Sequence, residues 1–266
     1  MPFKSKLGQN FLVDPQAAER IAAALGDLSG RTVVEIGPGR GAITGGLASR
    51  AGHVIAVELD RELAAQLRAR FAPERVTVIE RDVLEFDLDA AASEAGGRLC
   101  VAGNLPYYIT SPILLKLAAS HKGLETAVLM VQREVAERVT AGPGSRDFGL
   151  LSVTVQMYGP VQPLFTLPPG AFSPPPEVYS TVFRWRFAPR FAELGVEEES
   201  FLRFVRQAFA QKRKTLANNL RAAGVAPGAA AAALEKAAID QRVRAESLPI
   251  DALAELWQAL AEQQST

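Results

Sequence analysis

The sequence contains a single cysteine, Cys100, and only two histidines among its 266 residues. One cysteine excludes an internal disulfide framework and any multi-cysteine metal site. The apolar surroundings of Cys100 predict a core position for it. No stretch approaches the ~20 apolar residues that cross a bilayer, and the N-terminus lacks the apolar segment of a secretory signal. We therefore expect a cytoplasmic protein with no metal and no membrane-spanning segment.

The charge balance lacks an excess of either sign, with 29 Lys and Arg against 29 Asp and Glu. Neutrality is not typical of a nucleic-acid binder, but the basic residues are unevenly distributed. Residues 200–221 contain no acid and six bases: Arg203, Arg206, Lys212, Arg213, Lys214 and Arg221. Such asymmetry can place a phosphate-binding patch on a neutral molecule. Charge alone leaves open the alternative of a solvated helix face.

Short apolar runs alternate with helical patterns over the first 185 residues. The predicted strands are 32–36, 53–59, 76–80, 99–104 and 126–131, with a clear helical pattern at 61–71. Nearly continuous apolar strands separated by helices indicate a parallel sheet that is covered on both faces. Two further predicted strands, 161–167 and 180–187, are joined by a proline-rich connection that is too short for a helical crossover. We expect these two to pair antiparallel at one edge of the sheet.

Beyond residue 191 the sequence contains alanine, leucine and charged residues at helical spacing and no strand pattern. Three helices are predicted, at 198–222, 226–238 and 250–263, with Pro227 and Pro249 near two of their starts. The chain is therefore expected to form two domains, 1–190 and 191–266.

The segment VVEIGPGRGAIT places Gly37, Gly39 and Gly41 between a predicted strand and a predicted helix. Glycine is needed where the backbone turns sharply and approaches a ligand without a Cβ. The helix that follows can present free N–H groups to that ligand. Because Gly37, Gly39 and Ala42 also satisfy the dinucleotide pattern, the glycines alone do not separate a nicotinamide cofactor from S-adenosylmethionine.

Three acids bear on the choice of cofactor. Glu58 ends the second strand, where a carboxylate can accept both ribose hydroxyls, which fits either cofactor. Asp82 follows the third strand, within reach of an adenine amine. Glu35 lies inside the first strand, where a buried acid is costly unless it is compensated. A cationic sulfonium cofactor or a lysine from a loop would compensate it, whereas a pyrophosphate would not. Arg40 is the one basic residue placed to meet phosphates, so the acids together favour S-adenosylmethionine.

The tetrad Asn104-Leu105-Pro106-Tyr107 ends the fourth strand, at the sheet edge where open α/β folds present their active sites. The Asn104 side-chain oxygen and the Leu105 carbonyl can accept the two hydrogens of an adenine amine and direct its lone pair at a methyl donor. Pro106 fixes the chain so that the two oxygens converge, and Tyr107 offers a ring face to a base taken out of its stack. The tetrad therefore predicts amine methylation by orientation and electrostatics, without a strong base.

With these motifs the sequence closely resembles the KsgA family, the small-subunit ribosomal RNA adenine-N6,N6-dimethyltransferases. The resemblance covers nearly the whole chain. It rests on QNFL (9–12), EIGPGRGAIT (35–44), VELD (57–60), Asp82, GNLPYYI (103–109), LMVQREVAERV (129–139), AFSPPPEVYSTV (171–182) and FAQKRKTLANNL (209–220). It implies a Rossmann-like class I methyltransferase fold with a mostly parallel seven-stranded sheet, followed by a small all-α domain.

The resemblance also implies roles for individual residues. Asn10 and Leu12 would close over S-adenosylmethionine, Gly37 and Gly39 would hold its methionine end, Glu58 its ribose and Asp82 its adenine. The implied cofactor site comprises Gln9, Asn10, Leu12, Gly37, Gly39, Glu58, Leu59, Asp82, Val83 and Asn104. Asn104, Leu105, Pro106 and Tyr107 would hold the target adenine, with the Phe172 ring opposite Tyr107.

The implied substrate is a pair of adjacent adenines in the 3′-terminal hairpin of 16S rRNA, each dimethylated on a nearly complete pre-30S subunit. Lys212, Arg213, Lys214 and Arg221 would bind the rRNA backbone through phosphate contacts. A monomer is expected. The departures from the family pattern are Tyr108, where a small polar residue is common, and the neutral net charge.

Three alternatives remain. A sister group dimethylates an adenine of 23S rRNA and confers macrolide resistance, but the proline run after Phe172 and the Lys-Arg-Lys helix argue against it. A nicotinamide-dependent oxidoreductase lacks a hydride-transfer partner, because His53 and His121 are expected to be structural. A non-catalytic assembly factor would not need the complete tetrad.

Overall fold

The computed structural model describes residues 9–264, and the chain forms two compact units. Unit 1 comprises Met1–Ala136 and Pro160–Phe187, and unit 2 comprises Glu137–Gly159 and Ala188–Thr266. The chain enters unit 2 twice. The second entry, between residues 187 and 188, lies close to the domain boundary expected near residue 190. The structure also groups residues 137–159 with the C-terminal helices, whereas the sequence pattern predicts them in the first domain.

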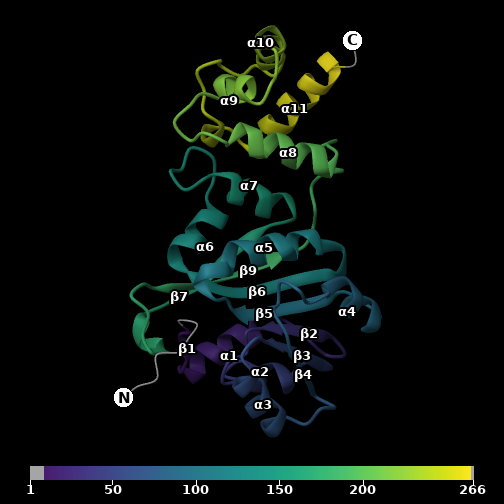
Figure 1. Cartoon of the computed structure of the whole chain (residues 1–266), viewed down its shortest axis with the longest axis vertical. Coiled ribbons are helices and arrows are strands. Elements are labelled where there is room, and N and C mark those ends of the chain that lie inside the picture. Colours follow the sequence, from purple (N-terminus) through teal and green to yellow (C-terminus); the bar gives the residue numbers. More distant parts are fainter. Residues whose placement is uncertain (1–8, 265–266) are drawn as a thin grey trace. The chain divides into compact units, whose positions relative to one another are not determined.

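Unit 1 is built on a seven-stranded sheet in the order β4-β3-β2-β5-β6-β9-β7, which can be followed in Figure 1. Strands β2 to β6 run parallel to one another. They are β2 (Thr32–Ile36), β3 (His53–Glu58), β4 (Val76–Glu80), β5 (Leu99–Asn104) and β6 (Leu124–Gln132). The prediction of a mostly parallel sheet is confirmed, with the five strands within two residues of their expected bounds.

The expected antiparallel pair lies at one edge of this sheet. β9 (Ser180–Arg186) is inserted antiparallel between β6 and β7 (Val161–Leu167), so that β7 forms the edge. The register pairs Gln132 at the end of β6 with Ser180 at the start of β9. The start of β9 therefore arrives at the same sheet edge as the carboxyl ends of the parallel strands.

Apolar residues on one face of the sheet pack against α1 (Pro15–Ala23) and α2 (Thr44–Ala48) in a continuous core, to which Cys100 contributes as expected. The other helices that begin in unit 1 are α3 (Arg61–Arg70), α4 (Leu88–Glu94), α5 (Thr110–Ala119) and α6 (Arg133–Thr140), with short turns η1 (Tyr107–Ile109), η2 (His121–Gly123) and η3 (Pro169–Ala171). Asp14 and Asp60 start α1 and α3 by accepting hydrogen bonds from free backbone N–H groups of the first turn. Across residues 9–264, no helix is both long and apolar enough to cross a membrane.

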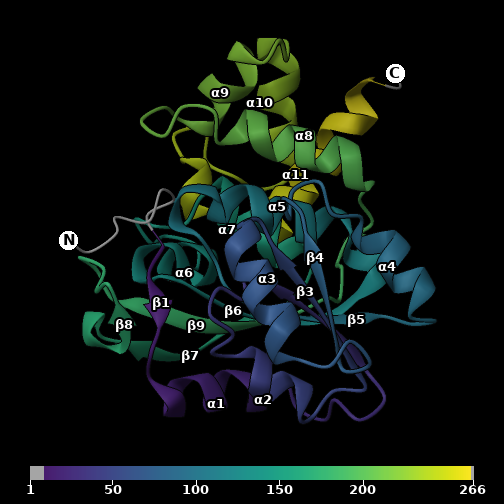
Figure 2. The ribbon, with the colours of Figure 1, turned by 60° about the horizontal axis from the view of Figure 1, so that its bottom comes forward.

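The sequence pattern did not predict a two-stranded ribbon that joins residues 11–12 to residues 172–173 within unit 1. β1 (Phe11–Leu12) pairs antiparallel with β8 (Phe172–Ser173), and Figure 2 shows the two strands side by side. The Val13 N–H also donates to the Ala171 carbonyl at 2.9 Å. These bonds fix the segment that contains Asn10 and Phe11 against the body of unit 1.

Unit 2 is helical, as expected, but the single helix predicted for 198–222 is wrong. The segment forms α8 (Glu198–Ala208) and α9 (Leu216–Ala222), separated by a turn at 209–215. The buried Asn219 side chain ends α8 by donating to the carbonyls of Ala208 (2.6 Å) and Gln211 (3.3 Å). The remaining elements of unit 2 are α7 (Leu150–Met157), α10 (Pro227–Lys236), η4 (Ala245–Ser247) and α11 (Ile250–Gln264).

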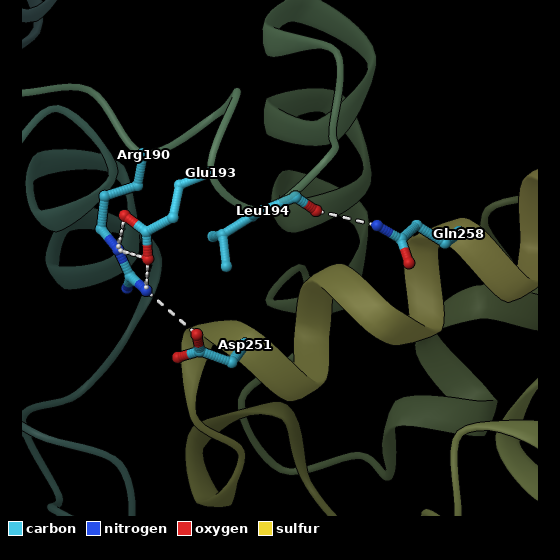
Figure 3. A network of polar contacts seen from close by, with 5 residues as sticks. All are labelled: Arg190, Glu193, Leu194, Asp251 and Gln258. Carbon is cyan, nitrogen blue, oxygen red and sulfur yellow. Dashed lines mark hydrogen bonds and ion pairs between the residues drawn. The ribbon is translucent and has the colours of Figure 1, made fainter.

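Aromatic pairs and one polar network hold the elements of unit 2 together. Phe201 meets Trp257 edge to face at 6.3 Å between ring centroids. Arg190 forms ion pairs with Glu193 (2.8 Å) and Asp251 (3.0 Å), and Gln258 donates to the Leu194 carbonyl at 2.8 Å (Figure 3). The segment that enters unit 2 after β9 is thus fixed to α11 at two points.

Candidate active site

A cavity of about 420 Å³ lies at the carboxyl ends of the central parallel strands, a volume in the range of small-molecule sites. The strand order reverses between β2 and β5, which is where open α/β sheets bind ligands. All ten residues expected at the cofactor line this cavity: Gln9, Asn10, Leu12, Gly37, Gly39, Glu58, Leu59, Asp82, Val83 and Asn104. Leu105, Pro106 and Tyr107 also line it.

The glycine loop forms the wall of the cavity after β2. Gly37, Gly39 and Gly41 have φ of +62°, +56° and +75°, a region that side chains with a Cβ rarely adopt. A Cβ on Gly39 would also lie 3.0 Å from Cδ1 of Phe11, whose ring is covered by the Arg40 guanidinium at 4.5 Å. The loop therefore needs glycine for its conformation and at Gly39 for the close approach of Phe11.

Glu58 ends β3 with its carboxylate buried in the wall of the cavity. Its Oε2 accepts from the Gly39 N–H and its Oε1 from the Asp60 N–H, both at 2.9 Å. Burial raises the pKa of Glu58, and these N–H groups oppose the rise. Because a carboxylate has about four acceptor positions, Glu58 holds the glycine loop in place and still has acceptor capacity towards the cavity.

Asp82 follows β4 and uses one oxygen in its own turn, where Oδ1 accepts from the Leu84 N–H at 2.8 Å. The side chain is half-buried and lines the cavity. Asp82 and Glu58 therefore place two carboxylates on the β3–β4 side of the cavity.

Glu35 is the most unusual group in the cavity wall. Its side chain is 1% exposed, and its Oε2 has no hydrogen-bond partner among the described residues. Burial raises its pKa to about 7; the Thr44 hydroxyl opposes the rise, and the nearby Glu58 carboxylate adds to it. A buried acid without a compensating partner is costly, so the site is suited to a cationic ligand.

Asn104 ends β5 with its carboxamide fixed by the segment before β1. Its Nδ2 donates to the Asn10 carbonyl at 3.0 Å. A carbonyl can only accept, so the nitrogen must face Asn10, and Oδ1 remains as the acceptor on the other side of the amide. The orientation of Asn104 is thus determined by the chemistry of its partner.

The backbone after Asn104 is held equally firmly. The Leu105 N–H donates to the Met130 carbonyl at 2.9 Å, and the Pro106 carbonyl accepts from the Thr110 hydroxyl at 3.0 Å. Within residues 9–264 the Leu105 carbonyl accepts no hydrogen bond. Asn104 and Leu105 therefore each present an acceptor to which no residue of 9–264 donates.

Tyr107 is half-buried and is positioned by a residue that sequence reasoning missed. Its hydroxyl lies 3.0 Å from the Ser180 hydroxyl, which is fully buried at the start of β9. The strand at 180–187 was predicted, but no local signal relates Ser180 to a tyrosine 73 positions earlier. The pairing depends on the antiparallel insertion of β9.

Phe172 is the predicted site residue that the structure does not bring to the cavity. Its ring is 3% exposed, lies in the core with residues of α1, and is absent from the cavity wall. The physical reason is strand alternation: β8 pairs Phe172 with Leu12, and both side chains turn into the core while Ser173 is exposed. In this arrangement the ring does not face Tyr107 across a base.

The predicted RNA-binding cations lie in unit 2. Lys212, Arg213 and Lys214 are exposed on the turn between α8 and α9, rather than on a helix as expected, and Arg221 is exposed on α9. The Lys212 ammonium donates to the Arg146 carbonyl at 3.0 Å. No acid belongs to the segment 200–221, so its positive charge is not internally balanced.

The sequence matches the family described as "Ribosomal RNA adenine dimethylase" over residues 1–262. It is 61% identical over 260 residues to "Ribosomal RNA small subunit methyltransferase A" of Acidobacterium capsulatum, covering 97% of this chain and 92% of that one. The protein of the same name from Koribacter versatilis is 49% identical, with 97% and 94% covered.

Two solved structures are similar over nearly the whole chain. A dimethyladenosine transferase from Plasmodium falciparum has a TM-score of 0.81 at 23% identity, covering 96% of this chain and 98% of that one. The 23S rRNA methyltransferase ErmE has a TM-score of 0.72 at 25% identity, covering 95% and 100%. At 23% identity, the first similarity is one of fold.

Proposed function

Because the chain belongs to the ribosomal RNA adenine dimethylase family, we propose that it methylates N6 of two adjacent adenosines in the 3′-terminal hairpin of 16S rRNA. Each adenosine receives two methyl groups from S-adenosylmethionine, on a pre-30S subunit. The names of the relatives at 61% and 49% identity support the small subunit as the substrate. The orientation of Asn104 is the single observation on which the chemistry rests.

The residues present fit S-adenosylmethionine. The unpartnered Oε2 of the buried Glu35 provides the negative charge that a cationic cofactor requires. Gly37 and Gly39 would hold the methionine end, Glu58 the ribose and Asp82 the adenine, each from the wall of the same cavity. When bound, the cofactor supplies an electrophilic methyl carbon on a sulfonium.

Asn104 and Leu105 orient the amine. With its nitrogen committed to the Asn10 carbonyl, Asn104 presents Oδ1 to one N6 hydrogen, and the Leu105 carbonyl accepts the other. Both bonds draw the nitrogen towards a pyramidal geometry and direct its lone pair at the methyl carbon. The N6 proton is acidic once nitrogen carries the new methyl group, and it is released to solvent, so no strong base is needed. In the second round one hydrogen remains, and a single acceptor is sufficient to orient the amine.

Tyr107 supports the extracted adenine. Its hydroxyl bond to Ser180 fixes the ring at the edge of the cavity, where a base taken out of its stack can lie against the ring face. Stacking and orientation together lower the entropy cost of reaching the reactive geometry.

The C-terminal domain at 191–266 contributes binding to rRNA. The exposed turn of Lys212, Arg213 and Lys214, with Arg221, provides phosphate contacts that position the RNA without reading its sequence. Catalysis would then belong to residues 1–190 without residues 137–159, which the structure groups with the C-terminal helices.

Mass spectrometry of rRNA nucleosides after incubation with labelled S-adenosylmethionine tests the proposed function. The substrates are small subunits that lack the hairpin methylation, free 16S rRNA, and large subunits as a control. We expect N6,N6-dimethyladenosine in the small-subunit hairpin. Label in 23S rRNA would instead place the activity with the macrolide-resistance type, and no label in any substrate would favour a non-catalytic assembly factor.

A further inference from the structure

Two exposed tyrosines lie next to the hydrogen bond that positions Tyr107. Tyr108 is 60% exposed and follows Tyr107, while Tyr179 is 46% exposed and precedes Ser180. Within residues 9–264 no other aromatic side chain is exposed. Exposure of aromatic rings is therefore confined to the surroundings of the predicted substrate site.

Tyr179 is held by a cation. The Arg133 guanidinium lies over the Tyr179 ring at 5.3 Å from its centroid. The backbone N–H of Arg133 also donates to the Tyr179 carbonyl at 2.9 Å. This pair follows the carboxyl end of β6 and precedes β9, at the sheet edge that bears Asn104. Tyr179 itself does not line the cavity, whereas Tyr108 does.

The charge around Tyr179 favours a base over a phosphate. Glu134 follows Arg133 and Glu177 lies two residues before Tyr179, and both are exposed. Residues 133–134 and 177–179 thus contribute two acidic side chains and one basic side chain, which is no excess of positive charge. An aromatic ring that carries a cation on one face is instead a stacking surface for an unpaired base.

We propose that Tyr108 and Tyr179, with Arg133 behind Tyr179, stack the unpaired base adjacent to the adenosine whose own base occupies the cavity. This rests on the proposed function. Taking one adenine out of its stack leaves its neighbour without a stacking partner, and the exposed rings replace that partner. Because the two target adenosines are adjacent, the same surface receives one of them while the other reacts.

A series at Tyr179 tests the need for an aromatic ring. Undermethylated small subunits are the substrate, and kcat/KM is measured for Tyr179→Phe, Tyr179→Trp, Tyr179→Leu and Tyr179→Ala. Loss of a base–aromatic stack should lower kcat/KM about 5- to 150-fold in the Leu and Ala variants, while Phe and Trp keep near wild-type values. Val178→Ala, a neighbouring exposed side chain, is the matched control and should remain unchanged. Equal values for Phe and Leu would overturn the proposal.

A second measurement identifies the stacked nucleotide. Wild type and Tyr179→Ala are each titrated with a synthetic hairpin that carries either two adjacent adenosines or one adenosine beside an abasic site. Removing the neighbouring base should weaken binding to wild type more than it weakens binding to Tyr179→Ala, because the variant has already lost the Tyr179 part of the stack. Equal weakening in both proteins would overturn the proposal.

The two hypotheses fail in different ways. If wild type transfers no label to small subunits, the proposed function is wrong. If wild type is active and the Tyr179 series shows no dependence on the ring, the stacking surface is wrong and the proposed function stands.

Discussion

The amide of Asn104 has one side engaged by the protein and one side facing the cavity. Asn104→Asp keeps an oxygen towards the amine but places a carboxylate oxygen against the Asn10 carbonyl, where Nδ2 now donates. We expect kcat to fall on the order of 100-fold or more in Asn104→Asp and in Asn104→Ala, the scale of removing one oriented hydrogen bond to the transition state.

RNA affinity of the two Asn104 variants is the control measurement, and it should change little because Asn104 lies inside the cavity. An equal loss of RNA binding and of methylation would contradict the role of Asn104 in orienting the amine.

Glu35 should make folding stability depend on pH. Its pKa of about 7 in the folded protein lies above the ordinary 4.5, so the unfolded chain ionises first as pH rises. The folded state is therefore favoured below pH 4.5 and loses stability up to about pH 7. Relative to Glu35→Gln, the unfolding free energy of wild type should fall by about 2 kcal/mol from pH 5.5 to pH 7.5.

Urea unfolding of the two proteins at both pH values measures this difference. If the unfolding free energy of wild type changes between the two pH values by the same amount as that of Glu35→Gln, Glu35 is already ionised, or compensated, in the folded protein.

Among the structural elements, the close spacing of β2 and β5 limits what can occupy Gly103. A Cβ at this position would lie 2.7 Å from the Ile36 carbonyl oxygen on the neighbouring strand. Gly103→Ala should destabilise the protein by about 1–3 kcal/mol or more, since the backbone of one strand must move. Gly45→Ala is the matched control, because Gly45 lies in α2 with nothing within 4 Å of its added Cβ.

Helix propensity predicts that Gly45→Ala is neutral or stabilising. Denaturant midpoints of the two glycine variants give the comparison, and a similar loss in both would argue against close strand spacing as the cause.

The turn between α8 and α9 depends on Asn219. Removing its side chain leaves the Ala208 carbonyl without this donor in a buried setting, whereas the Gln211 carbonyl still accepts from the Lys214 N–H at 3.0 Å. Asn219→Ala should lower the unfolding free energy by about 1–3 kcal/mol and weaken RNA binding, because the turn holds Lys212, Arg213 and Lys214. Asn218→Ala removes a partly exposed side chain whose Oδ1 accepts one exposed hydrogen bond from Arg221, and it should cost no more than about 0.5 kcal/mol.

The same turn shows where sequence reasoning about elements reached its limit. Residues 209–215 contain no glycine or proline, and the break is imposed by the Asn219 side chain contacting α8. β1 and β8 are two residues each, too short to produce a periodic pattern. The parallel strands were predictable because each is an apolar run bounded by polar or glycine residues. β2, β3, β5 and β6 are largely buried on both faces, whereas the edge strand β4 is partly exposed.

The cavity was predictable for a related reason. Gly37, Glu58, Asp82 and Asn104 each end or follow a parallel strand, and such strands bring their carboxyl ends to one edge. Ser180 and Arg133 could not be assigned in this way. Their interactions with Tyr107 and Tyr179 depend on β9 lying antiparallel beside β6. Neither Ser180 nor Arg133 indicates that arrangement from the sequence.

At the scale of the whole molecule, we expect RNA binding to depend strongly on salt concentration even though the net charge is zero. If Lys212, Arg213 and Lys214 bind phosphates, replacing all three by alanine should make the plot of log K against log salt shallower, by about 0.7–0.9 for each phosphate that is no longer neutralised. Filter binding to 16S rRNA over a range of KCl measures the slope. Arg203→Ala is the control, because Arg203 is already paired with Glu199 at 2.8 Å. An unchanged slope in the triple variant would move the RNA-binding surface elsewhere.

The division of the chain between the two units affects the order in which the protein can fold during its own synthesis. Residues 137–159 belong with helices that end at Gln264, and residues 160–187 return to complete the sheet. At about 5–20 residues per second, α7 therefore emerges roughly 5 to 20 seconds before the last of its partners. Over that interval a nascent chain exposes the apolar face of α7, and chaperones that bind such segments can bind it until its partner helices have been synthesised.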